Sequence, residues 1–365
     1  MHELEGARRF LRPMRGDDVP RSLDEALDMA AQAFEDGDLE AARTAAGRAV
    51  TIDPRSAEAR HFLAAALAEL GDHEGADRQY HEALALAPDD PEILLGACHM
   101  VLDYAGEQDG FAEVVEIARR GAAIATKKND DDLRAEFLLA EGGALLELGS
   151  PDQALKVFES AASLLPNHPE PHLQIGQALF HLLRLEEARA SLLRALSLAP
   201  ELALAHWSLA LIAERMGDLE ESQRRFRRAS RIDERGFPTP LSLSEDEFDE
   251  VVEQALARIP NAVKEKMGNL AVTCEPIPSE EDLLSDGPPL PPTILGLFRG
   301  HPLGEKQSPN PWAHFPSSIV LYQRNLERAC QTRTELVRQI EITVLHEVGH
   351  FLGWDEDDLS ARGLD

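Results

Sequence analysis

Near its C-terminal end the chain carries the pattern H-E-x-x-H, formed by His346, Glu347 and His350. On a helix, residues four apart lie on one face, so both imidazoles can bind one metal ion. Glu347 projects beside them, where its carboxylate can take a proton from a metal-bound water. A chain with 13 histidines also produces this pattern by chance, so the interpretation depends on the surrounding elements.

A third metal ligand is expected shortly after the motif. Gly353 is suited to end the helix, because glycine adopts the left-handed C-cap conformation at little cost. The chain can then turn back so that Glu356 reaches the metal, which leaves a fourth position for water or substrate. Asp355 and Asp357 are alternative ligands, and Asp355 is equally suited to cap a short helix over 356–363.

The motif is predicted to lie on an amphipathic helix over residues 334–352. On a helical wheel, His346 and His350 lie about 40° apart on one side. Glu341 is the one charged residue on the opposite side. The apolar residues on that side are Val337, Ile340, Val344, Leu345, Val348, Phe351 and Leu352. The helix is therefore expected to bury one face and to present both histidines on the other.

Upstream of this helix the pattern indicates a small α+β domain. Ser244 and Glu247 form a capping box, which predicts a helix that ends before Pro260. The segments LAVTCEP, TILGLFRG and SSIVLYQRNL are short and rich in β-branched or aromatic residues, so strands are predicted there. The order helix, strands, helix is typical of an α+β domain of about 125 residues.

The first two thirds of the chain repeat with a period of 34 residues. Matching prolines, Pro54 and Pro88, and again Pro166 and Pro200, are each 34 residues apart. The gap from Pro88 to Pro166 is 78 residues, which indicates an insertion in the third of about six units. A repeat of this length is the mark of stacked supersecondary units, none of which buries its apolar face alone.

Each unit is predicted to be a pair of antiparallel helices. A glycine (Gly37, Gly71, Gly149 or Gly217) is placed at the turn between the helices. Alanines at 42, 76, 154 and 188 allow close approach. Larger apolar residues four positions further on in the repeat, Tyr80, Phe158, Leu192 and Phe226, fill the space beside them. The pattern resembles tetratricopeptide repeats over residues 21–235. That resemblance implies a right-handed superhelical solenoid whose groove binds a protein or peptide.

The chain is strongly acidic, with a net charge of −30. Such a field repels nucleic acid and anionic membranes, so neither is expected as a partner. The segment RRFRR, residues 224–228, is an exception with two interpretations. It grips an acidic partner, or it is a solvated face that offsets the acidic chain.

The expected compartment is the cytoplasm. Cys98, Cys274 and Cys330 are too few and too far apart to form a disulfide framework. Residues 1–20, expected to be a flexible tail, contain no apolar core of a secretory signal. No stretch approaches the 18 apolar residues of a membrane span.

The C-terminal part also resembles a known family. The segments EDEFDEVVEQALARIP, LGLFRGHPL, SIVLYQRNLERAC and TVLHEVGHFLGWDEDDL are similar to minimal zincin-type metallopeptidases, with H-E-x-x-H-x-x-G-x-x-[D/E]. The resemblance implies that His346 and His350 are Zn²⁺ ligands, that Glu347 is the general base and that Glu356 matches the third ligand. The usual acid there is Asp, so Glu356 is a departure.

The expected organisation is therefore a tetratricopeptide solenoid, a linker over 236–242 and a zincin-like domain over 243–365, which are expected to fold separately. The implied function is a zinc metallopeptidase whose repeats recruit a substrate or adaptor. The alternative is a non-catalytic scaffold whose C-terminal domain binds metal without hydrolysis. Oxyanion stabilisers for hydrolysis are expected upstream of the motif, and the candidates are Tyr322, His301 and His314. The simpler explanation of each is a core tyrosine or a surface-loop histidine.

Overall fold

A computed structural model of the chain describes residues 20–104, 108–268, 270–284, 289–300 and 317–354. These ranges contain 17 helices and three strands. By its contacts the chain divides into two compact units, one of Met1–Leu148 with Ser163–Leu165 and one of Gly149–Ala162 with Pro166–Asp365. None of the helices in these ranges has the length and apolar character that crossing a membrane requires.

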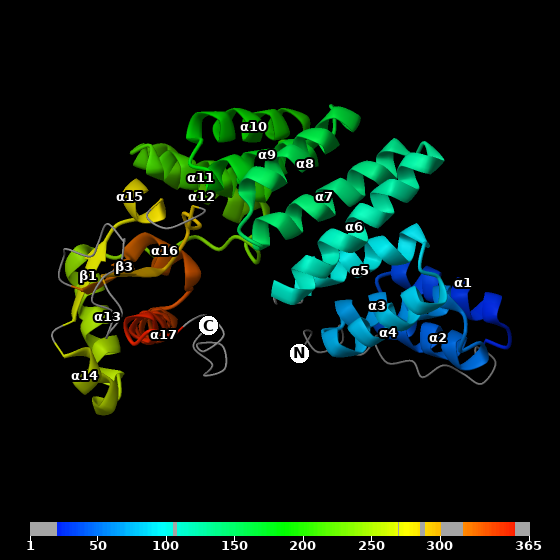
Figure 1. The fold of residues 1–365 in the computed structure, drawn as a ribbon, viewed down its shortest axis with the longest axis horizontal. Helices are drawn as coiled ribbons and strands as arrows, with labels where there is room; N and C mark the ends of the chain where they lie inside the picture. The colour runs from blue at the N-terminus through cyan, green and yellow to red at the C-terminus, as the bar shows by residue number, and fades with distance from the viewer. Residues whose placement is uncertain (1–19, 105–107, 269, 285–288, 301–316, 355–365) are drawn as a thin grey trace, which may run out of the picture. The chain divides into compact units, whose positions relative to one another are not determined.

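Helices α1–α12 follow one another along the chain, joined by short connections (Figure 1). Their bounds are α1 Leu23–Glu35, α2 Leu39–Ile52, α3 Ala57–Glu69, α4 His73–Leu86, α5 Pro91–Tyr104, α6 Gln108–Lys128, α7 Asp131–Glu147, α8 Pro151–Leu164, α9 Pro169–His181, α10 Leu185–Leu198, α11 Ala203–Arg215 and α12 Leu219–Ile232. In the first compact unit α1 packs on α2 and α3 packs on α4. In the second compact unit α9 packs on α10 and α11 packs on α12. These pairs confirm the predicted all-α repeat solenoid.

Small residues let the paired helices approach closely, as the period predicts. The alanines of the second helices at 42, 76, 154 and 188 are fully buried, and so are those at 49, 83, 161, 195 and 229. The larger apolar residues Tyr80, Phe158, Leu192 and Phe226 are buried beside them. The repeated positions are therefore core, and functional side chains have to come from other positions.

The third repeat, formed by α5 and α6, is longer than the others. Helix α6 has 21 residues, whereas the second helices of the other units have 14. Helix α7, which packs on α6, has 17 residues where the other first helices of units, apart from α5, have 13. The gap from Pro88 to Pro166 exceeds two repeat periods by ten residues, and these extra residues lengthen helices α6 and α7.

Glycines occupy the left-handed positions at the turns inside the repeats. Gly37, Gly71, Gly149 and Gly217 have φ between +64° and +85°. In the fifth unit a leucine, Leu183, takes this position with φ +58°. A β-carbon at Gly217 would meet no atom within 4 Å, so the backbone conformation alone selects glycine there.

Two alanine substitutions separate this backbone effect from helix propensity. Gly217→Ala is expected to lower the free energy of unfolding by about 1 kcal/mol, because the left-handed conformation is strained for alanine. Gly47→Ala is expected to raise it by about 0.5–1 kcal/mol, because Gly47 lies inside α2 with open space around its β-carbon position. Urea unfolding followed by circular dichroism measures both. A loss of stability in both variants would contradict the explanation.

The C-terminal domain surrounds a three-stranded sheet in the order β1-β3-β2. Strand β1 (Ala271–Glu275) runs parallel to β3 (Ser318–Tyr322), and β2 (Gly296–Arg299) pairs with β3 in antiparallel register. The helices α13 (Glu245–Arg258) and α17 (Arg333–Phe351) pack against each other beside it. The structure confirms the small α+β domain and places the three strands within the segments where strands were predicted.

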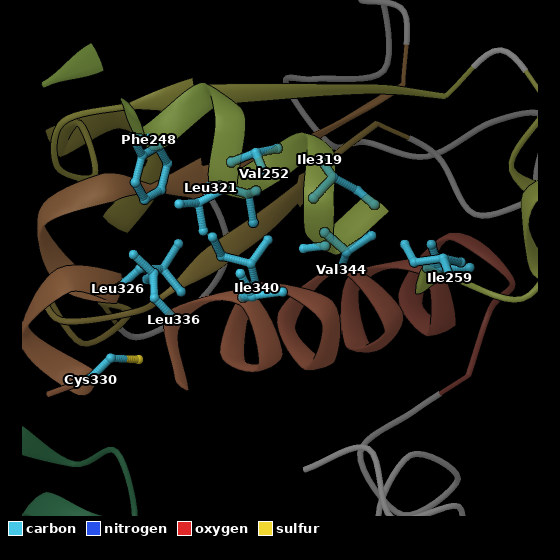
Figure 2. Close-up of a cluster of buried hydrophobic side chains, with 14 residues drawn as sticks. Phe248, Val252, Ile259, Ile319, Leu321, Leu326, Cys330, Leu336, Ile340 and Val344 are labelled. Carbon is cyan, nitrogen blue, oxygen red and sulfur yellow. The ribbon is translucent and has the colours of Figure 1, made fainter. Parts of the chain in front are cut away.

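Helices α13 and α17 share one apolar core with the sheet (Figure 2). Phe248, Val252 and Ile259 come from the α13 region, and Ile340 and Val344 come from α17. The sheet contributes Ile319 and Leu321, which lie between the two helices in the cluster that Figure 2 shows. The predicted capping box at Ser244 is present and fixes the start of α13.

Three short helices of this domain were not predicted from the sequence. They are α14 (Asn261–Met267), α15 (Glu280–Leu283) and α16 (Gln323–Ala329). The segment SSIVLYQRNL was predicted to be one strand, but its last four residues form the start of α16. The buried Asn325 side chain donates to the carbonyl oxygens of Pro292 and Ile294 at 3.2 and 2.6 Å, which holds this turn of chain in place.

Within the second unit, the last repeat and the C-terminal domain share a buried ion pair. Glu214 on α11 accepts hydrogen bonds from Arg324 at 3.0 Å and from Arg328 at 2.6 Å, both on α16. Arg215 donates to the carbonyl oxygen of Pro278 at 3.2 Å. Separate folding of the repeats and of this domain stays a prediction, and an isolated fragment leaves one side of the ion pair unmatched.

Candidate metal centre

Helix α17 carries the H-E-x-x-H motif and is fixed at both ends. A capping box precedes its first residue. At its other end Gly353 has φ +84°, and the N–H groups of Gly353 and Trp354 donate to the carbonyls of His350 and Gly349, both at 3.0 Å. These two bonds form a Schellman motif, in which glycine is the preferred residue. Gly353 therefore ends the helix as predicted.

The two motif histidines converge on one point. The Nε2 atoms of His346 and His350 lie 3.0 Å apart, and their rings stand at 80° to each other. Two imidazoles bound to one tetrahedral Zn²⁺ at 2.0–2.1 Å would have these atoms about 3.3 Å apart. The side chains are partly exposed, whereas the face with Ile340, Val344 and Val348 is buried. The geometry of the pair thus fits one shared metal ion.

Glu347 lies on the side of α17 that contacts strand β2. Its side chain is buried, with 7% of the residue exposed. The backbone N–H of Phe298 on β2 donates to Glu347 Oε2 at 2.7 Å. A charge-assisted hydrogen bond from a backbone N–H holds a carboxylate in place. The motif glutamate is therefore oriented by the neighbouring strand.

A close approach of backbone to helix makes this contact possible. A β-carbon added to Gly296 would lie 2.6 Å from Thr343 Cγ2 and 3.5 Å from Glu347 Cγ. Glycine at this strand position therefore lets β2 lie directly against α17. The packing of Phe298 against Phe351, with ring centroids 5.8 Å apart, supports the same approach one turn further along the helix.

The residues predicted to supply the third metal ligand lie outside the part of the chain that the structure describes. Among the residues that the structure describes, no three His, Cys, Asp or Glu side chains form a group that could hold a metal ion. Glu356 and the alternatives Asp355 and Asp357 all lie outside the described residues. Glu356 as the third ligand stays a prediction.

Of the three candidate oxyanion stabilisers, only Tyr322 lies within the described residues. His301 and His314 lie outside the described residues. Tyr322 is described and is fully buried. Ile319 and Leu321 belong to the core with α17, so the alternating position of Tyr322 faces the other side of the sheet. A phenol buried on that side does not reach a substrate at the motif.

An arginine that the sequence analysis did not single out holds the strand beside Glu347. Arg299, the residue after Phe298, donates to Asp282 at 2.8 and 2.6 Å and to Glu275 at 2.7 and 3.0 Å. Asp282 is completely buried. Burial alone would raise the pKa of Asp282, but hydrogen bonds from Arg299 and Ser279 hold it below its ordinary value. The sequence did carry a signal for this ion pair, because Arg299 is the one charged residue in the otherwise apolar segment ILGLFRG.

Comparison with protein families identifies both parts of the chain. Residues 267–364 match the zincin-like metallopeptidase family. The C-terminal domain is a zincin-like metallopeptidase domain. Residues 33–99, 115–170 and 145–206 match tetratricopeptide repeats. The zincin-like match begins in α14, whereas α13 shares the core with α17, so we propose that the folding unit of this domain is 243–365.

Solved structures support the fold of the repeats. PilW, a widely conserved type IV pilus biogenesis factor, matches with a TM-score of 0.52 and 16% identity over 64% of this chain and 99% of its own. The APC/C hetero-tetramer Cut9–Hcn1 matches with a TM-score of 0.50 and 18% identity over 60% of this chain and 42% of its own. These similarities show the fold alone. None of the curated proteins is similar enough to this chain to count as a match.

Proposed function

We propose that the protein is a zinc-dependent metallopeptidase whose tetratricopeptide repeats bind the protein or peptide to be cleaved, or an adaptor for it. The observation that carries the proposal is the arrangement on α17. Two histidine nitrogens 3.0 Å apart lie beside a buried glutamate whose carboxylate accepts an N–H bond from β2. A purely structural zinc is normally held by four protein ligands and has no use for an oriented base.

His346, His350 and Glu356 would hold the metal. When bound, Zn²⁺ polarises a peptide carbonyl and makes water a stronger acid. Glu347 takes the proton from the attacking water and delivers it to the leaving amine. Its bond from Phe298 fixes the carboxylate against the strand, beside the two histidines.

The substrate is proposed to lie along β2. This strand is at one end of the described sheet order β1-β3-β2, so its outer edge pairs with no other described strand. An extended peptide can add to such an edge through backbone hydrogen bonds. Because Phe298 on that edge contacts Glu347, a peptide bound there passes beside the proposed base.

The metal requirement gives the direct test. We expect about one Zn²⁺ per purified chain, and we expect His346→Ala and Glu356→Ala to lose most of it, whereas Asp357→Ala retains it. Hydrolysis of an unstructured protein should stop on chelation and return with added Zn²⁺. Metal analysis and gel-based cleavage measure both. Zinc-loaded protein that cleaves nothing, including proteins that co-purify through the repeats, would favour the non-catalytic scaffold.

A further inference from the structure

The last helix of the repeats gathers five arginines around one cavity. Arg224, Arg225, Arg227, Arg228 and Arg231, all on α12, line a cavity of about 380 Å³ together with His206 from α11. The chain as a whole has a net charge of −30. A cationic surface on so acidic a protein is a local feature that its composition does not explain.

The acids nearby neutralise only part of this charge. Glu221 accepts hydrogen bonds from Arg224 and from Arg225, and Glu201 pairs with Arg228. Among the described residues, no carboxylate lies within ion-pair distance of the other two arginines of the cavity. Five guanidinium groups therefore face two carboxylates, and the cavity keeps an excess of positive charge.

An uncharged histidine in the wall of the cavity holds Arg225, one of the two arginines that share Glu221. His206 Nδ1 lies 3.1 Å from Arg225 Nη1, and its Nε2 lies 3.1 Å from the carbonyl oxygen of Pro200. Arg225 can only donate, so Nδ1 accepts and Nε2–H donates to the carbonyl, which is the neutral tautomer. Burial and then the charge of Arg189 lower the pKa of Arg225. An anion in the cavity would relieve this crowding of cations.

A second cavity lies next to the first and has a different character. It has a volume of about 590 Å³ and shares Arg227 with the first cavity. Leu219 and Phe226 line it from α12, and Leu241 and Leu243 line it from the connection to α13. Charged side chains of both signs line it as well, so it has apolar contacts without the excess of arginines found in the first cavity. A ligand that spans both cavities therefore places negative charges against the α12 arginines and apolar groups against these leucines and Phe226. An acidic peptide with apolar residues has both, whereas a nucleic acid has phosphates throughout and is repelled by the rest of the chain.

We infer that the α12 arginines and the leucines and Phe226 of the adjoining cavity bind an extended peptide segment with a cluster of acidic residues next to apolar ones. The carboxylates lie against the arginines in the geometry that guanidinium groups favour, and the apolar side chains enter the second cavity. This inference deepens the recruitment part of the proposed function and rests on it for its biological role. The binding itself requires neither metal nor hydrolysis.

The test uses the full chain and a fluorescent peptide of four glutamates followed by two leucines. Fluorescence anisotropy should show binding that weakens with salt, because exposed charges are screened. The matched peptide with glutamines in place of glutamates should bind about tenfold more weakly or worse. A labelled single-stranded oligonucleotide of similar charge should bind no better than the glutamine peptide. Equal binding of the oligonucleotide would overturn the inference in favour of a general polyanion surface.

Variants assign the binding to the cavity. Arg227→Gln with Arg231→Gln should weaken the acidic peptide by about tenfold or more, because two charge-assisted contacts are lost. Arg235→Gln, an exposed arginine just beyond α12, is the matched control and should change binding less than about twofold. Both variants remove exposed arginines, and thermal melting checks their folding. Equal effects of both, or no binding to wild type, would refute the site, while Glu347-dependent hydrolysis reports on the proposed function separately.

Discussion

Glu347→Gln is expected to retain the fold and the bound Zn²⁺ but to lower the rate of peptide hydrolysis by roughly 10²–10⁴-fold, the usual range for loss of a general base. The amide keeps the shape of the side chain, and its carbonyl oxygen can still accept the N–H of Phe298 that now binds the carboxylate. The change thus removes proton transfer and leaves the packing against β2. Initial rates on an unstructured protein substrate, with zinc content measured on the same samples, test this expectation.

A matched control lies on the same helix. Glu341 is two turns closer to the start of α17 and is only partly buried, so Glu341→Gln should leave the rate within about twofold of wild type. His346→Ala should lose both metal and activity, which distinguishes loss of a ligand from loss of the base. Equal rates for wild type and Glu347→Gln, with zinc present in both, would show that this glutamate is not the base.

The motif helix could be predicted from the sequence because its signals are local. The apolar positions Val337, Ile340, Val344 and Val348 recur at helical spacing, and all four are buried in the structure. Gly353 ends the helix in a conformation that few other residues adopt. The same reasoning placed Glu347 beside the histidines but did not predict its burial. That burial depends on β2, which is 49 residues away from it along the chain.

Contacts between distant segments explain what the sequence could not predict. The strand in SSIVLYQRNL ends at Tyr322, and α16 follows because Asn325 bonds to the chain near Pro292, a contact that no local pattern encodes. The partners of Arg299 come from two other segments, around Glu275 and Asp282. Periodicity assigns a residue to a buried or exposed face, whereas an ion pair between segments depends on which segments the fold brings together.

Arg299→Met is expected to lower the free energy of unfolding of the C-terminal domain by about 3–5 kcal/mol, because it breaks an ion pair with a buried carboxylate. Asp282 is fully buried, and only 18% of the Arg299 side chain is exposed. Glu275 is 35% exposed and can be hydrated when the arginine is removed, so most of the loss comes from Asp282. Urea unfolding of the full chain, followed by near-ultraviolet circular dichroism, measures the change.

An exposed ion pair in the same domain is the control. Arg333 on α17 pairs with Glu250 on α13 at 2.9 Å, with side chains 44% and 67% exposed. Arg333→Met removes the same functional group but should cost only about 0.2–1 kcal/mol, because water screens exposed charges. If Arg299→Met costs no more than Arg333→Met, the buried carboxylate does not depend on Arg299.

The double variant tests the cause of the loss. Asp282→Asn removes the buried charge but keeps an oxygen that can accept the hydrogen bonds from the N–H and hydroxyl groups of Ser279. Combined with Arg299→Met, it should recover more than half of the stability lost in the single variant, because the buried negative charge is removed together with the arginine. A double variant no more stable than Arg299→Met would show that the arginine acts through packing.

Because Arg299 follows Phe298, the single variant Arg299→Met should also release the strand that orients Glu347. It should therefore lose hydrolytic rate while the two histidines still hold zinc.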